Sequence, residues 1–143
     1  MRRLLLLIAA APRSLRAAPT RRQAAPGLMP SFLLQTGSIP LNGVEGRIDH
    51  FGFDATRQRL FVAALGNDTV EVVDLRVGRV IQQIKKLRAP QDIGFAPKSD
   101  RVAVANDEDG SVRLYEGTSL HQTAKVALKD DADNVRYDST SDH

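Results

Sequence analysis

Three pairs of polar residues recur in this sequence at one fixed spacing. They are Asp49-His50, Gln91-Asp92 and Asp133-Asn134, and the first members of successive pairs lie 42 residues apart. Carboxylate, amide and imidazole groups can hydrogen-bond a small ligand, and carboxylate and amide oxygens can bind a hard divalent cation. The same groups can instead cap the strands that follow them by bonding to neighbouring backbone amides. Both interpretations stay open from the sequence.

The spacing of these pairs belongs to an internal repeat without gaps. Residues 51–54 recur at 93–96 and again at 135–138, residues 59–63 recur at 101–105, and residues 69–74 recur at 111–116. Chance does not produce three matching segments at one offset. A period of this length is typical of solenoids and propellers.

Each repeat contains four short runs rich in Val, Ile, Phe and Tyr, separated by turn residues. The runs are 50–54, 59–65, 69–75 and 79–85, then 92–96, 101–105, 111–116 and 121–127. The run from Leu60 to Leu65 is apolar on both faces, as in a strand covered on both sides. Four short antiparallel strands in each 42-residue unit predict an all-β fold made of β-propeller blades. The six polar residues precede the inner strands, at one mouth of the central channel, and we call them the mouth residues.

The repeats resemble the YVTN-type β-propeller repeat of bacterial proteins. In that family a Tyr-Val-Thr-Asn-like strand end precedes a short turn, a Val-x-Val-Ile-Asp strand and a Gly-Lys-Val-like return. The matching segments here are Phe61–Ala64, Val104–Asn106, Val70–Asp74 and Gly78–Val80, with Gly46–His50 and Asp131–Asp138 also similar. The resemblance covers roughly residues 36–138 and implies a full-length relative of about seven blades. It implies little about function.

The repeat predicts how the chain is organised. We expect a leader at 1–30, a return strand at 36–41, blades at 46–87 and 88–129, the first strand of a further blade at 130–138, and a disordered tail at 139–143. That makes about two and a half blades, whereas a closed propeller needs about four to eight. We therefore expect an incomplete ring in a truncated chain. Self-association through the exposed blade faces is an alternative way to cover them.

The first residues of the chain are typical of a targeting segment. Arg2 and Arg3 precede eight apolar residues, Leu4 to Ala11, a run too short to span a membrane but typical of a secretory signal peptide. A periplasmic or secreted location follows. Recurrent arginine with no acid before Glu45 is also compatible with a mitochondrial transit peptide. A disordered start on a cytoplasmic protein is the third possibility.

Composition excludes several classes of function. The chain has no cysteine, so disulfides and cysteine metal sites are impossible. It has no tryptophan and only 5% aromatic residues, which argues against a base-stacking surface. Residues 1–45 carry a net charge of +5, whereas residues 46–143 carry −2. The mildly acidic body argues against a nucleic-acid partner.

The sequence contains no catalytic constellation, and the three histidines lack metal-ligand spacing. We expect a scaffold that binds a small ligand or a protein through the mouth residues, without a cofactor. A metal-assisted, lactonase-like hydrolase that uses the mouth carboxylates and a divalent ion is the alternative. A truncated product without function is a third. The acidic stretch 106–110 aligns with an ordinary turn of the first repeat.

Overall fold

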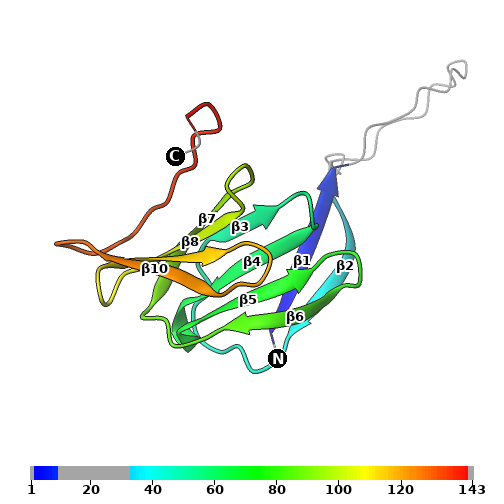
Figure 1. The fold of residues 1–143 in the computed structure, drawn as a ribbon. Coiled ribbons are helices and arrows are strands. Elements are labelled where there is room, and N and C mark those ends of the chain that lie inside the picture. The colour runs from blue at the N-terminus through cyan, green and yellow to red at the C-terminus, as the bar shows by residue number, and fades with distance from the viewer. Residues whose placement is uncertain (1, 10–32, 142–143) are drawn as a thin grey trace, which may run out of the picture.

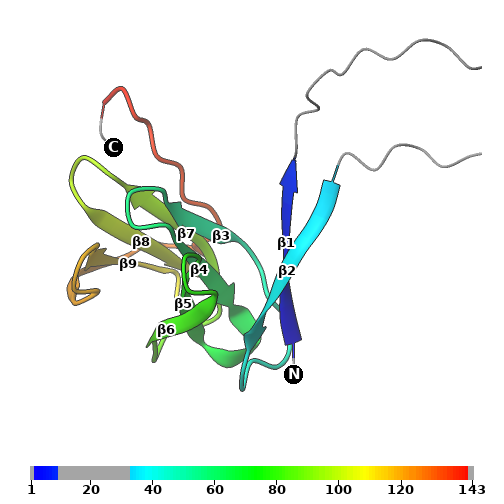
Figure 2. The same cartoon turned by 90° about the vertical axis from the view of Figure 1, so that its right-hand side faces the viewer.

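Three antiparallel sheets make up the part of the chain that the computed structural model describes, residues 2–9 and 33–141 (Figure 1). The smallest sheet contains β1 (Arg2–Ala9) and β2 (Leu33–Leu41). The first blade contains β3 (Phe51–Asp54), β4 (Arg59–Ala64), β5 (Thr69–Asp74) and β6 (Arg79–Ile84). The second blade contains β7 (Pro90–Ala96), β8 (Arg101–Asn106), β9 (Ser111–Glu116) and β10 (Gln122–Ala127). Figure 2 shows the β1–β2 ribbon and the second blade on opposite sides of the first blade.

Each blade is a four-stranded sheet whose strands pair in chain order. The predicted all-β fold, with blades of four antiparallel strands, is confirmed, and the strand ends fall within two residues of the predicted runs. Short turns join the strands. Between β4 and β5 the chain makes a 3-10 turn, η1 (Leu65–Asn67), and Asp68 then adopts a φ of 55°. Aspartate tolerates this left-handed conformation better than most residues do.

The main core lies between the two blades because β4 and β5 are apolar on both faces. Phe61 and Ala63 of β4 point toward the second blade, whereas Val62 and Ala64 point the other way. The buried residues of the inter-blade core are Phe61, Ala63, Val70, Val72, Ile84, Leu87, Ile93, Val102, Val104, Tyr115 and Leu120. Burial of these side chains from both blades provides the main attraction between them.

The other face of the first blade is covered by the segment that begins with β2. Ile39, Leu41 and Val44 pack against Val62 and its neighbours in a second buried cluster. The expected return strand at 36–41 therefore lies within β2, whose partner is β1. Residue 1 and residues 10–30 of the expected leader lie outside the described residues, and the signal peptide stays a prediction.

The segment 130–138, expected as the inner strand of a further blade, is irregular in the structure. No strand pairs with it within the described residues, and an extended segment without a ladder partner is not a strand. Residues 139–141 of the expected tail form a turn in which Asp138 accepts hydrogen bonds from Thr140 and Ser141. Residues 142–143 lie outside the described residues.

The blades meet at glycines that repeat with the period of the sequence. A Cβ at Gly52 would lie 2.8 Å from Cγ2 of Ile93, and a Cβ at Gly94 would lie 2.5 Å from Cγ1 of Val135. In both places a branched side chain from the following repeat packs against the bare backbone of the preceding inner strand. Phe51, which aligns with Ile93, has no preceding blade among the described residues and is 49% exposed.

We predict that Gly52→Ala destabilises the protein by about 1–3 kcal/mol, because the added methyl group overpacks the contact with Ile93. Gly37→Ala is the matched control, since nothing lies within 4 Å of a Cβ built there. Urea unfolding followed by circular dichroism measures both. Equal stability of the two variants would contradict this account of the inter-blade contact.

An ionic network connects the two blades near the β3–β4 and β7–β8 turns. Asp54 is fully buried, and its Oδ2 accepts hydrogen bonds from Nε and Nη2 of Arg59 at 3.1 and 2.8 Å. Arg59 also donates to the carbonyl of Gly117 in the second blade. Arg57 donates to both oxygens of Asp100, at 2.9 Å each, and to Asp54. Two buried or half-buried arginines thus bridge the two sheets.

The surroundings of Asp54 stabilise its ionised form. Burial by itself raises the pKa of Asp54, but hydrogen bonds from the backbone of Arg57 and from the side chains of Arg59 and Arg57 outweigh it. The pKa of Asp54 therefore lies below its ordinary value. A carboxyl group with a lowered folded-state pKa stabilises the fold above its unfolded-state pKa. That stabilisation is lost as the pH falls through the folded-state value.

We predict that Asp54→Asn costs about 3 kcal/mol at neutral pH, because it leaves the buried Arg59 without its anion. Below about pH 4 the stability of the natural protein falls and the difference between the two proteins shrinks. Glu108→Gln, which removes an exposed pair with Arg88, is the control and changes stability by less than about 1 kcal/mol. Urea unfolding at several pH values tests this, and a pH-independent difference would contradict it.

Candidate functional site

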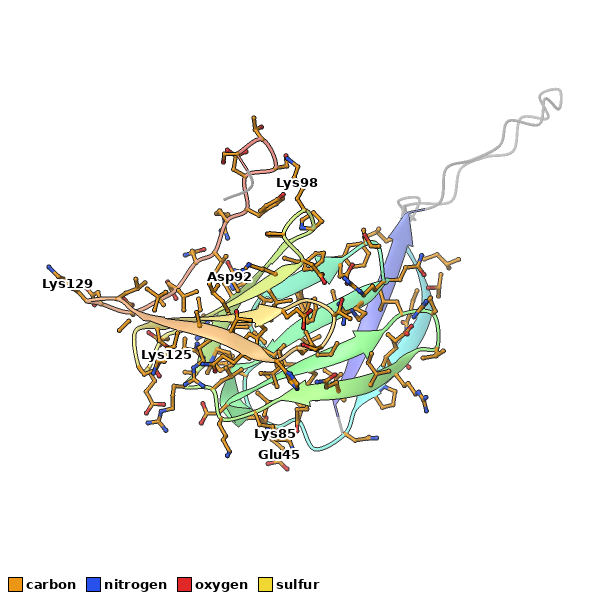
Figure 3. The ribbon with its side chains drawn as sticks, viewed as in Figure 1. Glu45, Lys85, Asp92, Lys98, Lys125 and Lys129 are labelled. Atoms are coloured by element: carbon orange, nitrogen blue, oxygen red, sulfur yellow. The ribbon has the colours of Figure 1, made fainter. Side chains whose placement is uncertain are left out.

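The mouth residues lie where the chain enters the inner strands. Figure 3 shows Glu45 and Lys85, from the segments that lead toward β3 and β7, near one end of the sheets, and Lys98 of the β7–β8 turn near the other. Asp49 and His50 directly precede β3, whereas Gln91 and Asp92 already belong to β7. Asp133 and Asn134 lie in the irregular segment that follows β10.

Hydrogen bonds join the first two pairs to each other and to the sheet. The backbone N–H of His50 donates to the carbonyl of Gln91 at 3.1 Å, which links the starts of β3 and β7. Asp49 donates its N–H to Ala63, and Ala63 donates to His50. The imidazole Nδ1 of His50 lies 3.0 Å from Oδ1 of Asp49. The first two pairs therefore lie together.

Asp92 connects the second pair to the third. It is only 4% exposed, and its Oδ1 accepts a hydrogen bond from the N–H of Ile93 at 2.8 Å. Its Oδ2 accepts from the N–H of Val135 at 2.9 Å and from Arg136 at 2.8 Å. Arg136 also donates to Oδ1 of Asn134 at 2.9 Å. Strand capping by a carboxylate accounts for most of the bonds that Asp92 makes.

Asp133 differs from the other mouth residues because it is exposed among other acids. The negative charge of Asp130, together with some loss of hydration and the charges of Asp107 and Asp133, raises the pKa of Asp131. This side of the mouth is therefore acidic. Asp133 adds to that charge, and no arginine of the described residues pairs with it as Arg47 pairs with Asp49 and Arg136 with Asp92.

The arginines at the mouth determine which charged groups are exposed to solvent there. Arg47 pairs with Asp49, and the exposed fractions of the two side chains are 64% and 12%. Arg136 pairs with Asp92, with exposed fractions of 74% and 6%. The two carboxylates point inward and are neutralised, whereas the guanidinium groups and the half-exposed imidazole of His50 point outward. Among residues 2–9 and 33–141, no three metal-ligating side chains gather.

Arg136 pairs with the mouth residue Asp92, but the sequence analysis did not include it among the candidates. It aligns with Gly52 and Gly94 in the first two repeats, so an arginine replaces glycine at this position of the repeat. That departure from the pattern is the signal that could have identified it. Arg47, which also lies outside the six mouth residues, donates a hydrogen bond to Asp49.

The acidic stretch at 106–110 forms the turn between β8 and β9. Glu108 pairs with Arg88 at 2.6 Å, and Asp109 accepts from Lys125, Ser111 and Arg113. Burial raises the pKa of Asp109, but these donors outweigh it and lower the pKa to about 2. The carboxylates of Glu108 and Asp109 are therefore engaged by cations of this chain.

Comparison with known proteins supports the fold and leaves the family open. No protein-family model and no curated protein matches this chain. The described structure is similar to Kuenenia stuttgartiensis hydrazine synthase, with a TM-score of 0.61 and 19% identity over 69% of this chain and 28% of that one. It is also similar to apo AztD from Citrobacter koseri, with a TM-score of 0.57 and 18% identity over 68% of this chain and 27% of that one.

A further crystal structure of Citrobacter koseri AztD matches with a TM-score of 0.57 and 17% identity, over 68% of this chain and 28% of that one. The chain thus spans under a third of the length of each of these proteins. Identities this low show the fold alone. No helix in the described residues is long and apolar enough to cross a membrane. The two four-stranded sheets are blades of a β-propeller-type fold.

Proposed function

We propose that this protein is a β-propeller scaffold of the YVTN type that binds a ligand with anionic groups through its mouth residues and their arginine partners. The observation that carries this proposal is the orientation of charge at the mouth. Arg47, His50 and Arg136 are exposed donors, whereas Asp49 and Asp92 are turned inward. Exposed guanidinium groups bind carboxylates and phosphates in preference to cations.

We favour the scaffold over the hydrolase alternative because of the bonds that Asp92 already makes. A metal-activated water requires free carboxylate or imidazole ligands and an open coordination position. Asp92 already accepts three hydrogen bonds, from Ile93, Val135 and Arg136. A metal ion at this carboxylate would have to displace the arginine and detach the segment after β10. A binding scaffold needs no such rearrangement.

We predict that citrate, as an anionic probe, perturbs the NMR signals of Arg47 and His50, and that Arg47→Ala weakens this binding about ten-fold, since it removes one charge-assisted contact. Arg88→Ala, which changes an exposed arginine paired with Glu108, is the control and leaves citrate binding unchanged. Titration with MnCl2 discriminates the alternative. Selective broadening at Asp49 and Asp92, or no response to citrate, would overturn the proposal.

We also propose that the leader directs the protein to the periplasm or the outside of the cell. Support comes from the basic start followed by the apolar run Leu4 to Ala11. Expression of the full chain in a Gram-negative host, followed by intact-mass measurement of the periplasmic and cytosolic fractions, tests this. We expect a periplasmic species that has lost its N-terminus up to Ala18 or Ala25, the small-residue candidates for cleavage. Recovery of only the intact chain in the cytosol would contradict it.

A further inference from the structure

A pocket of about 460 Å³ lies between the end of β2 and the outer strands of the first blade. Its walls are Pro40, Asn42, Glu71, Arg79, Val80 and Gln83. Asn42 directly follows β2, Glu71 belongs to β5, and the last three wall residues belong to β6. Two charged groups of opposite sign and two amides therefore border one space. We call it the β2–β6 pocket.

The two elements that border the pocket are neighbours in the repeat. Asn42 aligns with Ile84, and the end of β2 packs against the first blade as the end of β6 packs against the second. Glu71 aligns with Arg113, whose Nη1 donates a hydrogen bond to the carbonyl of Lys86 just after β6. The pocket is therefore a space between two consecutive elements that this chain contains, and not a sheet face that another unit covers.

Glu71 brings a buried carboxylate to the pocket. The residue is only 2% exposed, and its Oε1 accepts hydrogen bonds from Oγ1 of Thr69 at 2.8 Å and from Nε2 of Gln83 at 2.5 Å. No basic side chain of residues 2–9 and 33–141 pairs with it. A buried charge without a counter-charge is costly, so a cation at this carboxylate would be stabilised.

Arg79 brings the opposite charge to the same pocket. Its side chain is exposed and makes no hydrogen bond or ion pair within the described part of the chain. Asp74 lies opposite Arg79 in the pairing of β5 with β6, but the carboxylate of Asp74 binds Arg76 at 2.8 Å instead. Glu71 and Arg79 do not pair with each other either. Both charges are therefore available to a molecule that enters between them.

The second repeat fills the aligned place with its own ion pairs. Glu71 and Gln83 align with Arg113 and Lys125, and both of these cations bind Asp109, at 3.2 and 2.8 Å. The first repeat has neither cation. Its departure from the second repeat thus leaves a carboxylate that this chain does not neutralise.

We propose that the β2–β6 pocket binds a zwitterion of the α-amino acid class. Its ammonium group would bind Glu71 and its carboxylate would bind Arg79, with an apolar side chain against Val80. The ammonium group supplies the counter-charge that Glu71 lacks, and a guanidinium binds a carboxylate through two parallel hydrogen bonds. The volume agrees, since small-molecule sites measure about 300–1,000 Å³. This site shares no residue with the mouth and does not depend on the function proposed there.

The test uses the full chain and three matched probes, followed by NMR titration. L-Leucine carries both charges, L-leucinamide lacks the carboxylate, and 4-methylpentanoate lacks the ammonium group. We expect leucine to shift the signals of Val80 and the side-chain amides of Asn42 and Gln83. It should bind about ten-fold more tightly than either analogue, because each analogue loses one charge-assisted contact.

Two variants assign the two contacts separately. Glu71→Gln should weaken the binding of leucine and leucinamide about ten-fold and leave 4-methylpentanoate unchanged. Arg79→Gln should weaken leucine and 4-methylpentanoate and leave leucinamide unchanged. Because Arg79 is exposed, this variant keeps the test open if Glu71→Gln fails to fold. Arg76→Gln, which changes a neighbouring arginine outside the pocket, is the control and should bind all three probes as the natural protein does.

Three results would overturn the proposal. The first is equal binding of leucine and its two analogues by the natural protein. The second is leucine binding that neither Glu71→Gln nor Arg79→Gln weakens. The third is the absence of any leucine-induced shift at millimolar concentration, together with a lower urea midpoint for Arg79→Gln than for Arg76→Gln. That last result would mean that Arg79 closes the pocket itself by pairing with Glu71 in solution.

Discussion

Apolar side chains on both faces of β4 and β5 have to be covered from two sides, and the arrangement of the other elements follows from that constraint. The second blade covers the face that carries Phe61 and Val72. The segment from β2 to Val44 covers the face that carries Val62 and Val73. A single four-stranded sheet of this composition would leave both of its apolar faces in water. Stacking of neighbouring units is therefore what stabilises such repeats.

The two ends of the stacked sheets use different devices to hold the blades in register. One end of the sheets carries the β3–β4 and β7–β8 turns. There, Arg57 and Arg59 connect the blades through Asp54, Asp100 and Gly117. At the mouth, backbone and carboxylate hydrogen bonds connect the starts of the inner strands. Between these ends, the contact of Gly52 with Ile93 sets the closest approach of the two sheets. The two blades are thus connected at both ends and along their inner strands.

Departures from the repeat occur where we place binding. An arginine replaces the repeat glycine at Arg136, and this arginine neutralises Asp92 while it remains largely exposed. Repeat units share the residues that make a blade, so positions where the units differ are free to carry function. The function proposed for the mouth rests on such a position, Arg136.

The sequence by itself determined the repeat, the eight blade strands to within two residues, and the burial of the strand after Leu60 on both faces. These features are local, since they depend on period, residue type and turn chemistry. Only the tertiary structure decided the partners of the mouth carboxylates, because Asp92 meets Arg136 across 44 positions of the chain. The irregular form of 130–138 was also beyond the sequence, since a strand depends on the ladder that a neighbour offers. The pairing of side chains between repeat units depends on long-range contacts. The 42-residue pattern predicts each blade but does not predict these pairs.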